Sequence, residues 1–521
     1  MPRVVLVPRD ERGAAWLQRP SPSALLADLN ETRARRHVAR AAGVGLSSAA
    51  LQVLAPQISA SMFLEAPEPQ DKPEIIHAVQ PGGPTLVQLP ADMIDLISRA
   101  HNGIDVVPVV GVRPAVVVPS ISGPAPGVQG KGHHRFKVKV VSAASGRPLQ
   151  AARVRAVLDA RNAIGSEATT DAQGVATVDT YDYSRIEILV VYPQRSCWTR
   201  VLRQVSCRGP SIRVPLRRLS SDPDILRLRY PHSELGDGAG VRVGVVDTGV
   251  GPHPHLEVSG GRNVVLTERP VEWQSNGNPH GTHVAGIIAG RAPRVGRRGL
   301  APGVAVYSIR AYPEGSGYTD TVAVADAIRA AIDADCDLIN LSLTLDDPRG
   351  SRTVEFMVNE ARRNGAVVIA AAGNGGRRPV GFPAANQRVI AVSALGRHDV
   401  VPEDVGGAIW SCTPHGTDPS DFVASFSNAG PEMDCSAPGV AIVSTVQGGY
   451  ADMDGTSMAA PCVTAIAARW LAASDLLAAP RNAERADAIA TLVRQAGRTL
   501  GFPRILEGRG LVSLPPLSAG Q

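Results

Sequence analysis

Apolar runs that alternate with helical patterns constrain the fold of this chain more than any other feature of its sequence. Strand-like apolar runs occupy residues 241–246, 305–311, 338–343, 367–372 and 389–392. Helical periodicity separates them at 322–334 and 354–364. This βαβ rhythm predicts an α/β domain over residues 222–518, in which helices cover both faces of a parallel sheet. In such sheets, functional side chains gather at the carboxyl ends of the strands.

The chain is too long for one hydrophobic core, since single cores stop growing at about 250–300 residues. Residues 1–125 are expected to form a small α+β unit, because helical patterns at 23–42 and 91–101 accompany apolar runs at 85–89 and 104–110. A linker rich in Gly and Pro follows at 123–132. Short strands at 135–141, 154–158 and 175–178, separated by turns, predict a β-sandwich over residues 133–218.

Composition excludes several classes of partner. The net charge is +5 over 521 residues, without a sustained basic run, so we expect no nucleic-acid partner. The chain holds no apolar stretch of about 20 residues and no secretory signal, which favours a cytoplasmic protein with no membrane partner. Its six cysteines lack the close pairs of zinc sites. For Cys197 and Cys207, a disulfide across a hairpin and two reduced thiols both remain open.

Three polar side chains stand where strands end or helices begin. Asp247 follows the apolar run 243–246, His280 opens a helical segment, and Ser457 lies in a turn of small residues before a helix. Each alone has a structural explanation. Together they supply a hydroxyl, an imidazole that removes its proton and a carboxylate that orients the imidazole, the set needed for nucleophilic catalysis.

The stretches around these residues read Val-Val-Asp-Thr-Gly at Asp247, His-Gly-Thr-His-Val-Ala-Gly at His280 and Gly-Thr-Ser-Met-Ala-Ala-Pro at Ser457. In sequence and in order they resemble the signature blocks of subtilisin-like serine proteases (subtilases, peptidase family S8). The resemblance covers about residues 235–514. It implies a three-layer subtilisin-like fold and a serine endopeptidase that acts on proteins or peptides through an acyl-enzyme on Ser457, without a cofactor.

The family resemblance also implies further site residues. The block Ile-Ala-Ala-Ala-Gly-Asn ends in Asn374, whose side-chain amide is then a donor to the oxyanion, beside the N–H of Ser457. Two edge segments would hold the substrate as an added strand. Their residues are Ser342, Leu343, Thr344, Gly315, Ser316 and Gly317. Gly373 and Gly381 would line the first specificity pocket and leave room for a large residue. The family usually has glycine at the position of Thr344, so this wall of the pocket is expected to be narrower or shifted.

Two other pairs of residues bear on the ligands that the site could bind. Where the family binds calcium, the matching residues are His255 and Pro293, which are not hard oxygen ligands, so no metal site is expected. Arg377 and Arg378 either border the specificity pocket, which would favour acidic substrate residues, or are simply solvated.

The N-terminal regions leave alternatives open. Residues 86–110 weakly resemble the inhibitory pro-domains of such proteases, which would cover the cleft until cleaved or displaced; an unrelated α+β domain is the other interpretation. Residues 146–154 and 169–174 resemble immunoglobulin-like modules, which here act either as a spacer or as the docking site of a regulatory protein partner. The rival to an enzyme is a degenerate protease scaffold that serves as a protein-binding module. The substrate, the trigger and the oligomeric state do not follow from the sequence.

Overall fold

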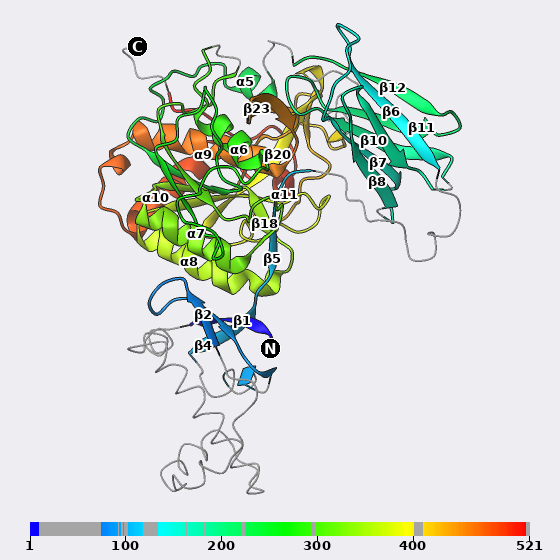
Figure 1. Cartoon of the computed structure of the whole chain (residues 1–521). Helices are drawn as coiled ribbons and strands as arrows, with labels where there is room; N and C mark the ends of the chain where they lie inside the picture. The colour runs from blue at the N-terminus through cyan, green and yellow to red at the C-terminus, as the bar shows by residue number, and fades with distance from the viewer. Residues whose placement is uncertain are drawn as a thin grey trace, which may run out of the picture. The chain divides into compact units, whose positions relative to one another are not determined.

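The computed structural model describes residues 1–9, 74–91, 93–94, 97, 103–117, 134–162, 164–181, 183–219, 224–293, 297–400 and 410–516 (Figure 1). The chain divides into two compact units. The smaller one comprises residues 1–112, 319–330 and 345–360, and the larger one comprises 113–318, 331–344 and 361–521. The helix predicted at 23–42 lies outside the described residues, as does most of the one predicted at 91–101, which is helical at 91, 93, 94 and 97.

The smaller unit is built on a four-stranded antiparallel sheet with the strand order β2-β3-β1-β4. Its strands are β1 (Arg3–Pro8), β2 (Glu74–Ala78), β3 (Thr85–Gln88) and β4 (Ile104–Pro108). Both faces of β1 are buried, as its unbroken apolar run requires. One face packs on the helical residues Met93 and Ile97.

The other face of this sheet packs on two helices whose first parts belong to the same unit. These are α7 (Thr321–Asp333) and α8 (Ser351–Arg363). Val322 and Phe356 join the apolar cluster that Val5 and Val7 form on that face. His77 Nε2 also lies 2.8 Å from Asp326 Oδ1. The N-terminal sheet is therefore seated on side chains that come from much later in the sequence.

The β-sandwich consists of two sheets within the larger unit. One has the order β11-β10-β7-β8 and the other β12-β6-β9. The strands are β6 (Arg135–Ser142), β7 (Arg153–Asp159), β8 (Ile164–Thr169), β9 (Val175–Asp179), β10 (Arg185–Tyr192), β11 (Arg200–Ser206) and β12 (Ser211–Leu216). Alternating apolar residues such as Phe136, Val138 and Val140 turn inward and form one core.

A ten-stranded, mainly parallel sheet forms the centre of the larger unit, with the order β14-β15-β13-β17-β19-β20-β22-β26-β25 and β21 paired to β20. Its strands are β13 (Arg242–Asp247), β14 (Gly260–Asn263), β15 (Ala305–Arg310), β17 (Leu338–Leu341), β19 (Val367–Ala371), β20 (Val389–Arg397), β21 (Asp421–Val423), β22 (Cys435–Pro438), β25 (Gly497–Arg498) and β26 (Leu511–Val512). The α/β class expected from the βαβ rhythm is confirmed. The run predicted as one strand at 338–343 ends at Leu341, and a new strand, β18 (Leu343–Leu345), follows Ser342.

Helices of this unit pack on the sheet and on one another, and Figure 1 shows α6 and α9 side by side. Their bounds are α5 (Ile225–Arg229), α6 (His280–Ala289), α9 (Thr456–Ala472), α10 (Ala483–Gln495) and α11 (Arg504–Glu507). A hairpin of β23 (Ile442–Val446) and β24 (Gly449–Met453) leads into α9. None of the helices in the described ranges is long and apolar enough to cross a bilayer.

Candidate active site

Asp247 and His280 lie together because a strand end and a helix start meet. Asp247 is the last residue of β13 and His280 is the first of α6. His280 Nδ1 is 2.7 Å from Asp247 Oδ1, and both side chains are only 2% exposed. A β-carbon at Gly281 would lie 2.5 Å from Gly249 O, so only glycine lets the helix approach the strand this closely. The carboxylate thereby fixes which imidazole nitrogen carries the proton.

Ser457 lies one residue inside α9, and its hydroxyl is not bonded to the imidazole. Ser457 Oγ donates a hydrogen bond to Ser342 O at 2.9 Å. His280 Nε2 is buried and has no hydrogen-bond partner among the residues that the structure describes. The structure therefore pairs Asp247 with His280, leaves the second imidazole nitrogen without a partner among the described residues, and engages the Ser457 hydroxyl with Ser342 O.

Two donors converge on one carbonyl oxygen, that of Ala115. Ser457 N donates to Ala115 O at 3.0 Å, and Asn374 Nδ2 donates to the same atom at 2.5 Å. The Asn374 amide is oriented by Thr456, whose N–H and hydroxyl both donate to Asn374 Oδ1, at 3.0 and 2.9 Å. Gly455, at φ 155°, leaves room for the same carbonyl, since a β-carbon there would lie 2.5 Å from it. Such a pair of N–H donors is suited to a developing oxyanion.

The Ala115 carbonyl belongs to an extended segment, residues 113–117, which overlaps the end of β5 (Gly111–Pro114). Main-chain hydrogen bonds hold this segment on both sides of the carbonyl. Ala115 N donates to Ser342 O at 3.0 Å, and Val117 N donates to Asp454 O at 2.9 Å. The Ala115–Val116 peptide bond consequently lies at Ser457 with main-chain hydrogen bonds before and after it. The chain itself thus provides an extended segment at Ser457 whose main-chain groups are paired.

Sequence analysis did not single out Ala115, Thr456 or Asp454. Residues 113–117 read Arg-Pro-Ala-Val-Val, which carries no periodic pattern and no reactive group. The only available signal was the proline, which favours extended backbone in the residue before it. The partners of the segment lie more than 200 positions later in the sequence, so no local pattern could identify them.

The predicted edge residue Ser342 lies in the site, and a chain of hydrogen bonds holds it. Its carbonyl accepts from Ala115 N, and its hydroxyl donates to Ser457 O at 2.9 Å. Leu343 is 1% exposed. The methyl carbon of Thr344 lies 3.2 Å and 3.3 Å from the positions that β-carbons at Gly373 and Gly381 would take. Thr344 therefore fills the space between the two glycines.

The other predicted edge, Gly315 to Gly317, forms a turn. Gly315 N donates to Asn276 O at 2.8 Å, and Ser316 N donates to Pro313 O at 3.0 Å. The strand that pairs with β5 comes two residues later, at β16 (Thr319–Asp320), where Asp320 is opposite Gly111 and Thr319 is opposite Val112. The assignment of Gly315, Ser316 and Gly317 to substrate binding stays a prediction.

Buried acids lie just before the serine. Burial, together with the neighbouring Asp454 carboxylate, raises the pKa of Asp452 to about 7. Asp452 Oδ1 accepts hydrogen bonds from the N–H and the hydroxyl of Thr199, at 3.0 and 3.2 Å. Burial also raises the pKa of Asp454, which accepts from Ala441 N at 2.6 Å and from Trp410 Nε1 at 2.9 Å. These bonds connect the sandwich and the 410–421 loop to the turn that presents Ser457.

The remaining sequence candidates have other partners. Arg377 Nη2 donates to Val423 O at 2.9 Å and to Cys412 Sγ at 3.1 Å. His255 Nδ1 lies 2.5 Å from the Tyr450 hydroxyl. All six cysteines are free thiols, including Cys197 and Cys207. In the described part of the chain, no group of three or more His, Cys, Asp or Glu side chains gathers as a metal site would require.

The sequence of this chain matches known proteins over the region that contains the candidate site. The model of the subtilase family matches residues 238–510, more than half of the chain. The thermostable alkaline protease of Halalkalibacterium halodurans is 36% identical over 276 residues, which are 53% of this chain and 66% of that protein. Alkaline elastase YaB of a Bacillus species is 38% identical over 232 residues, 44% of this chain and 54% of that protein. Subtilisin DY of Bacillus licheniformis is 36% identical over 260 residues, 49% of this chain and 85% of that protein.

The chain thus spans less than two thirds of the first two relatives, and its N-terminal regions lie outside the matched family model. The matched region contains Asp247, His280, Asn374 and Ser457. The resemblance inferred from the motifs is confirmed: this chain belongs to the subtilase family, peptidase family S8.

Proposed function

We propose that this chain is a serine endopeptidase that hydrolyses peptide bonds in proteins or peptides, with Ser457 as nucleophile, His280 as general base and Asp247 as its orienting carboxylate. One observation carries the proposal. A peptide carbonyl, that of Ala115, lies within hydrogen-bond distance of Ser457 N and Asn374 Nδ2. Two fixed donors aimed at one carbonyl oxygen are the arrangement that acyl transfer requires.

The first step of the reaction requires the Ser457 hydroxyl to exchange its hydrogen bond with Ser342 O for one with the imidazole. Ser457 Oγ turns from Ser342 O toward His280 Nε2, which is unpartnered among the described residues. It attacks the carbonyl carbon while Nε2 takes its proton, and Asp247, 2.7 Å from Nδ1, stabilises the imidazolium. The carbonyl oxygen becomes an oxyanion held by Ser457 N and Asn374 Nδ2.

In the next step His280 acts as an acid, and in the hydrolysis of the ester it acts as a base again. The C–N bond breaks as His280 gives the proton to the leaving amine, which departs and leaves an ester on Ser457. A water molecule then gives a proton to His280 and attacks the ester. Collapse of the second oxyanion releases the acid and returns the proton to Ser457. No redox or metal group takes part in these steps.

The same proposal includes restraint by the N-terminal part of the chain. The segment 113–117 forms main-chain hydrogen bonds with Ser342, Asp454 and Ser457, so a substrate must displace it to reach the serine. The segment comes shortly after β4, the last strand of the small sheet in the sequence. In that sheet Val5 and Val7 pack with Val322 and Phe356. The region weakly similar to inhibitory pro-domains would thus hold the protease inactive until it is cleaved or displaced.

The direct experiment is labelling of the full chain with a fluorophosphonate probe, followed by mass spectrometry of the labelled peptide. We expect one modified residue, Ser457, and loss of peptidase activity by about 10⁴-fold or more in Ser457→Ala. The control is Ser206→Ala, an exposed serine on β11. Label on another serine, or full activity in Ser457→Ala, would contradict the proposal. A chain that binds peptides but is never labelled would be the degenerate scaffold instead.

A further inference from the structure

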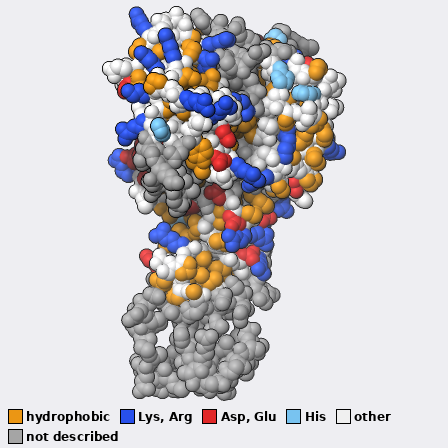
Figure 2. All heavy atoms as spheres, turned by 90° about the vertical axis from the view of Figure 1, so that its right-hand side faces the viewer, with side chains coloured by type: hydrophobic (Ala, Val, Ile, Leu, Met, Phe, Trp, Pro, Cys, Tyr) orange, Lys and Arg blue, Asp and Glu red, His pale blue; other side chains and the backbone are white. Residues whose placement is uncertain are grey.

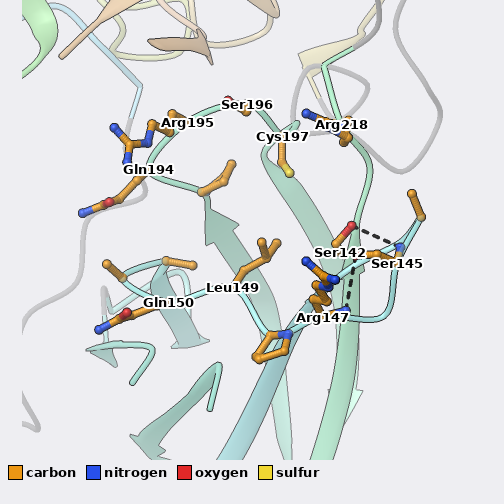
Figure 3. A pocket seen from close by; sticks show the side chains of 15 residues that line it. Ser142, Ser145, Arg147, Leu149, Gln150, Gln194, Arg195, Ser196, Cys197 and Arg218 are labelled. Carbon is orange, nitrogen blue, oxygen red and sulfur yellow. Dashed lines mark hydrogen bonds between the residues drawn. The ribbon is translucent and has the colours of Figure 1, made fainter. Parts of the chain in front are cut away.

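A pocket outside the active site opens on the β-sandwich. Its cavity is about 690 Å³, a size typical of ligand pockets. It is lined by residues of the turn after β6 and of the segments that flank β11 and β12: Ser142, Ala144, Ser145, Arg147, Pro148, Leu149, Gln150, Ala151, Ala152, Pro193, Gln194, Arg195, Ser196, Cys197 and Arg218. Figure 3 shows Gln194 and Arg195 on one side of it and Ser142, Ser145 and Arg147 on the other.

The lining is basic. Of the fifteen residues, three are arginines, Arg147, Arg195 and Arg218, and none is Asp or Glu. Arg147 and Arg218 form no ion pair with any residue that the structure describes, and both are exposed. Their positive charges are therefore uncompensated by the protein's own described side chains and attract an anion.

The whole sandwich shares this charge. Residues 133–218 contain fifteen Lys and Arg against six Asp and Glu, an excess of nine positive charges in a chain whose total excess is five. The rest of the chain is thus net acidic. Figure 2 shows basic side chains spread over the upper part of the face that it presents, with few acidic ones among them. Such a one-sided field steers an acidic partner to this domain.

One wall of the pocket is fixed to the protease body. Ser196 N donates to Tyr450 O at 2.8 Å, and Arg195 Nη1 donates to Gly448 O at 3.3 Å. Trp198, at 5% exposure, belongs to the same apolar cluster as the core of the large sheet. Because the 195–198 wall is held in this way, the pocket is formed before any ligand arrives, which lowers the entropic cost of binding.

We infer that this pocket binds an acidic segment of a partner protein, with carboxylates at Arg147, Arg195 and Arg218 and apolar side chains on Leu149 and Pro193. A polypeptide fits better than a nucleic acid, because none of the lining residues is an aromatic on which a base could stack. It also fits better than a small inorganic anion, because much of the lining is apolar. None of the residues that line this pocket is one of the proposed catalytic residues.

The test uses the full chain with Ser457→Ala, so that the probe is not digested. A fluorescein-labelled peptide of alternating Glu and Leu is titrated by fluorescence anisotropy, beside the same peptide with Gln in place of Glu. We expect the acidic peptide alone to bind, and its affinity to fall with added salt. Reversing two charges of the pocket with Arg147→Glu and Arg218→Glu should weaken binding by about tenfold or more.

The matched control reverses two exposed arginines of the sandwich that do not line the pocket, with Arg203→Glu and Arg208→Glu. It changes the net charge equally and should alter the affinity by less than about twofold. Equal losses in the two double variants, equal binding of the Gln peptide, or no binding of the acidic peptide would overturn the inference. So would tighter binding of a labelled oligothymidylate that is lost in the pocket variant, since the occupant would then be a nucleic acid. None of these results depends on catalysis, so the proposed peptidase activity is judged separately.

Discussion

The amide nitrogen of Ser457 donates a hydrogen bond to the carbonyl oxygen of Ala115, at 3.0 Å. The candidate nucleophile and a peptide bond of the same chain are therefore neighbours. Asn374 Nδ2 binds the same oxygen, so the carbonyl is polarised from two directions. A change at either donor or at the Ala115 peptide should therefore alter the reaction at a known atom.

The Ala115–Val116 bond is expected to be the one that the enzyme cuts in its own chain. We predict that purified wild-type protein accumulates a fragment whose N-terminus is Val116, whereas Ser457→Ala stays intact. Ala115→Pro should slow the cut by about 100-fold or more, because proline has no N–H to donate to Ser342 O. Ala115→Ser retains that N–H and should be processed normally. Intact mass and N-terminal sequencing are the measurements; a cut at another bond would contradict the prediction.

Removal of the Asn374 side chain should affect the transition state more than the ground state. In Asn374→Ala we expect kcat to fall by about 10²–10³-fold with little change in KM, because the amide donates most strongly to a charged oxygen. Steady-state kinetics on a peptide substrate separates the two constants. A main effect on KM, or a fall in kcat below about tenfold, would assign Asn374 a structural role through Thr456.

Thr344 should limit the size of the substrate residue that precedes the cut bond. Its methyl lies between Gly373 and Gly381, and the residue that the chain itself presents at the carbonyl is a small one, Ala115. Thr344→Gly should raise kcat/KM for Phe relative to Ala at that position by about tenfold or more. Thr344→Val, which keeps the branched shape, serves as the control. Matched peptides that differ in this residue provide the measurement, and an unchanged preference in Thr344→Gly would disprove the role.

Asp452 should make stability depend on pH. Its pKa is raised to about 7 by burial and by Asp454, so the folded state holds a proton that the unfolded state releases above about pH 4. The stability that this proton contributes is present at low pH and is lost as the pH rises through 7. Asp452→Asn keeps an oxygen for the Thr199 donors but has no charge. It should stabilise the protein by about 1–3 kcal/mol more at pH 8 than at pH 5.

Thermal unfolding at both pH values measures this difference. The control is Asp418→Asn, a partly exposed carboxyl whose pKa is held low by Arg397, so its removal should not stabilise the protein at high pH. An equal change in Tm for Asp452→Asn at both pH values would show that the buried carboxyl does not take up the proton.

The sequence predicts the parts of the fold whose determinants are local. The strand β19 is an unbroken apolar run and β13 contains one at residues 243–246, because both faces of a parallel sheet are buried. The strand β14, whose sequence is Gly-Gly-Arg-Asn, has no such run and was not predicted. Its register comes from its neighbour β15. The strand predicted at 338–343 ends at Leu341, and the next carbonyl, that of Ser342, accepts a hydrogen bond from Ala115 N, a residue far away in the sequence.

In the candidate site, too, the features that depend on local sequence could be predicted and those that depend on distant contacts could not. Asp247, His280 and Ser457 could be proposed because each lies in a characteristic local motif, and the Asp247–His280 contact is present. The sequence does not predict that residues 113–117 lie in the site, because their conformation depends on hydrogen bonds to residues far away in the sequence. The hydrogen bond from Ser457 Oγ to Ser342 O could not be predicted either, since a sequence motif specifies residue types and not side-chain rotamers.

Because the occupying segment and the catalytic residues are covalently joined, dilution cannot separate them. The tether keeps Ala115 at a high effective concentration beside Ser457 whatever the amount of protein in solution. Once the bond after Ala115 is cut, that tether is gone. Non-covalent contacts alone would then retain the N-terminal sheet, among them the packing of Val5 and Val7 with Val322 and Phe356 and the pairing of β5 with β16. A single hydrolysis would thereby convert a blockade that is independent of concentration into one that weakens as the protein is diluted.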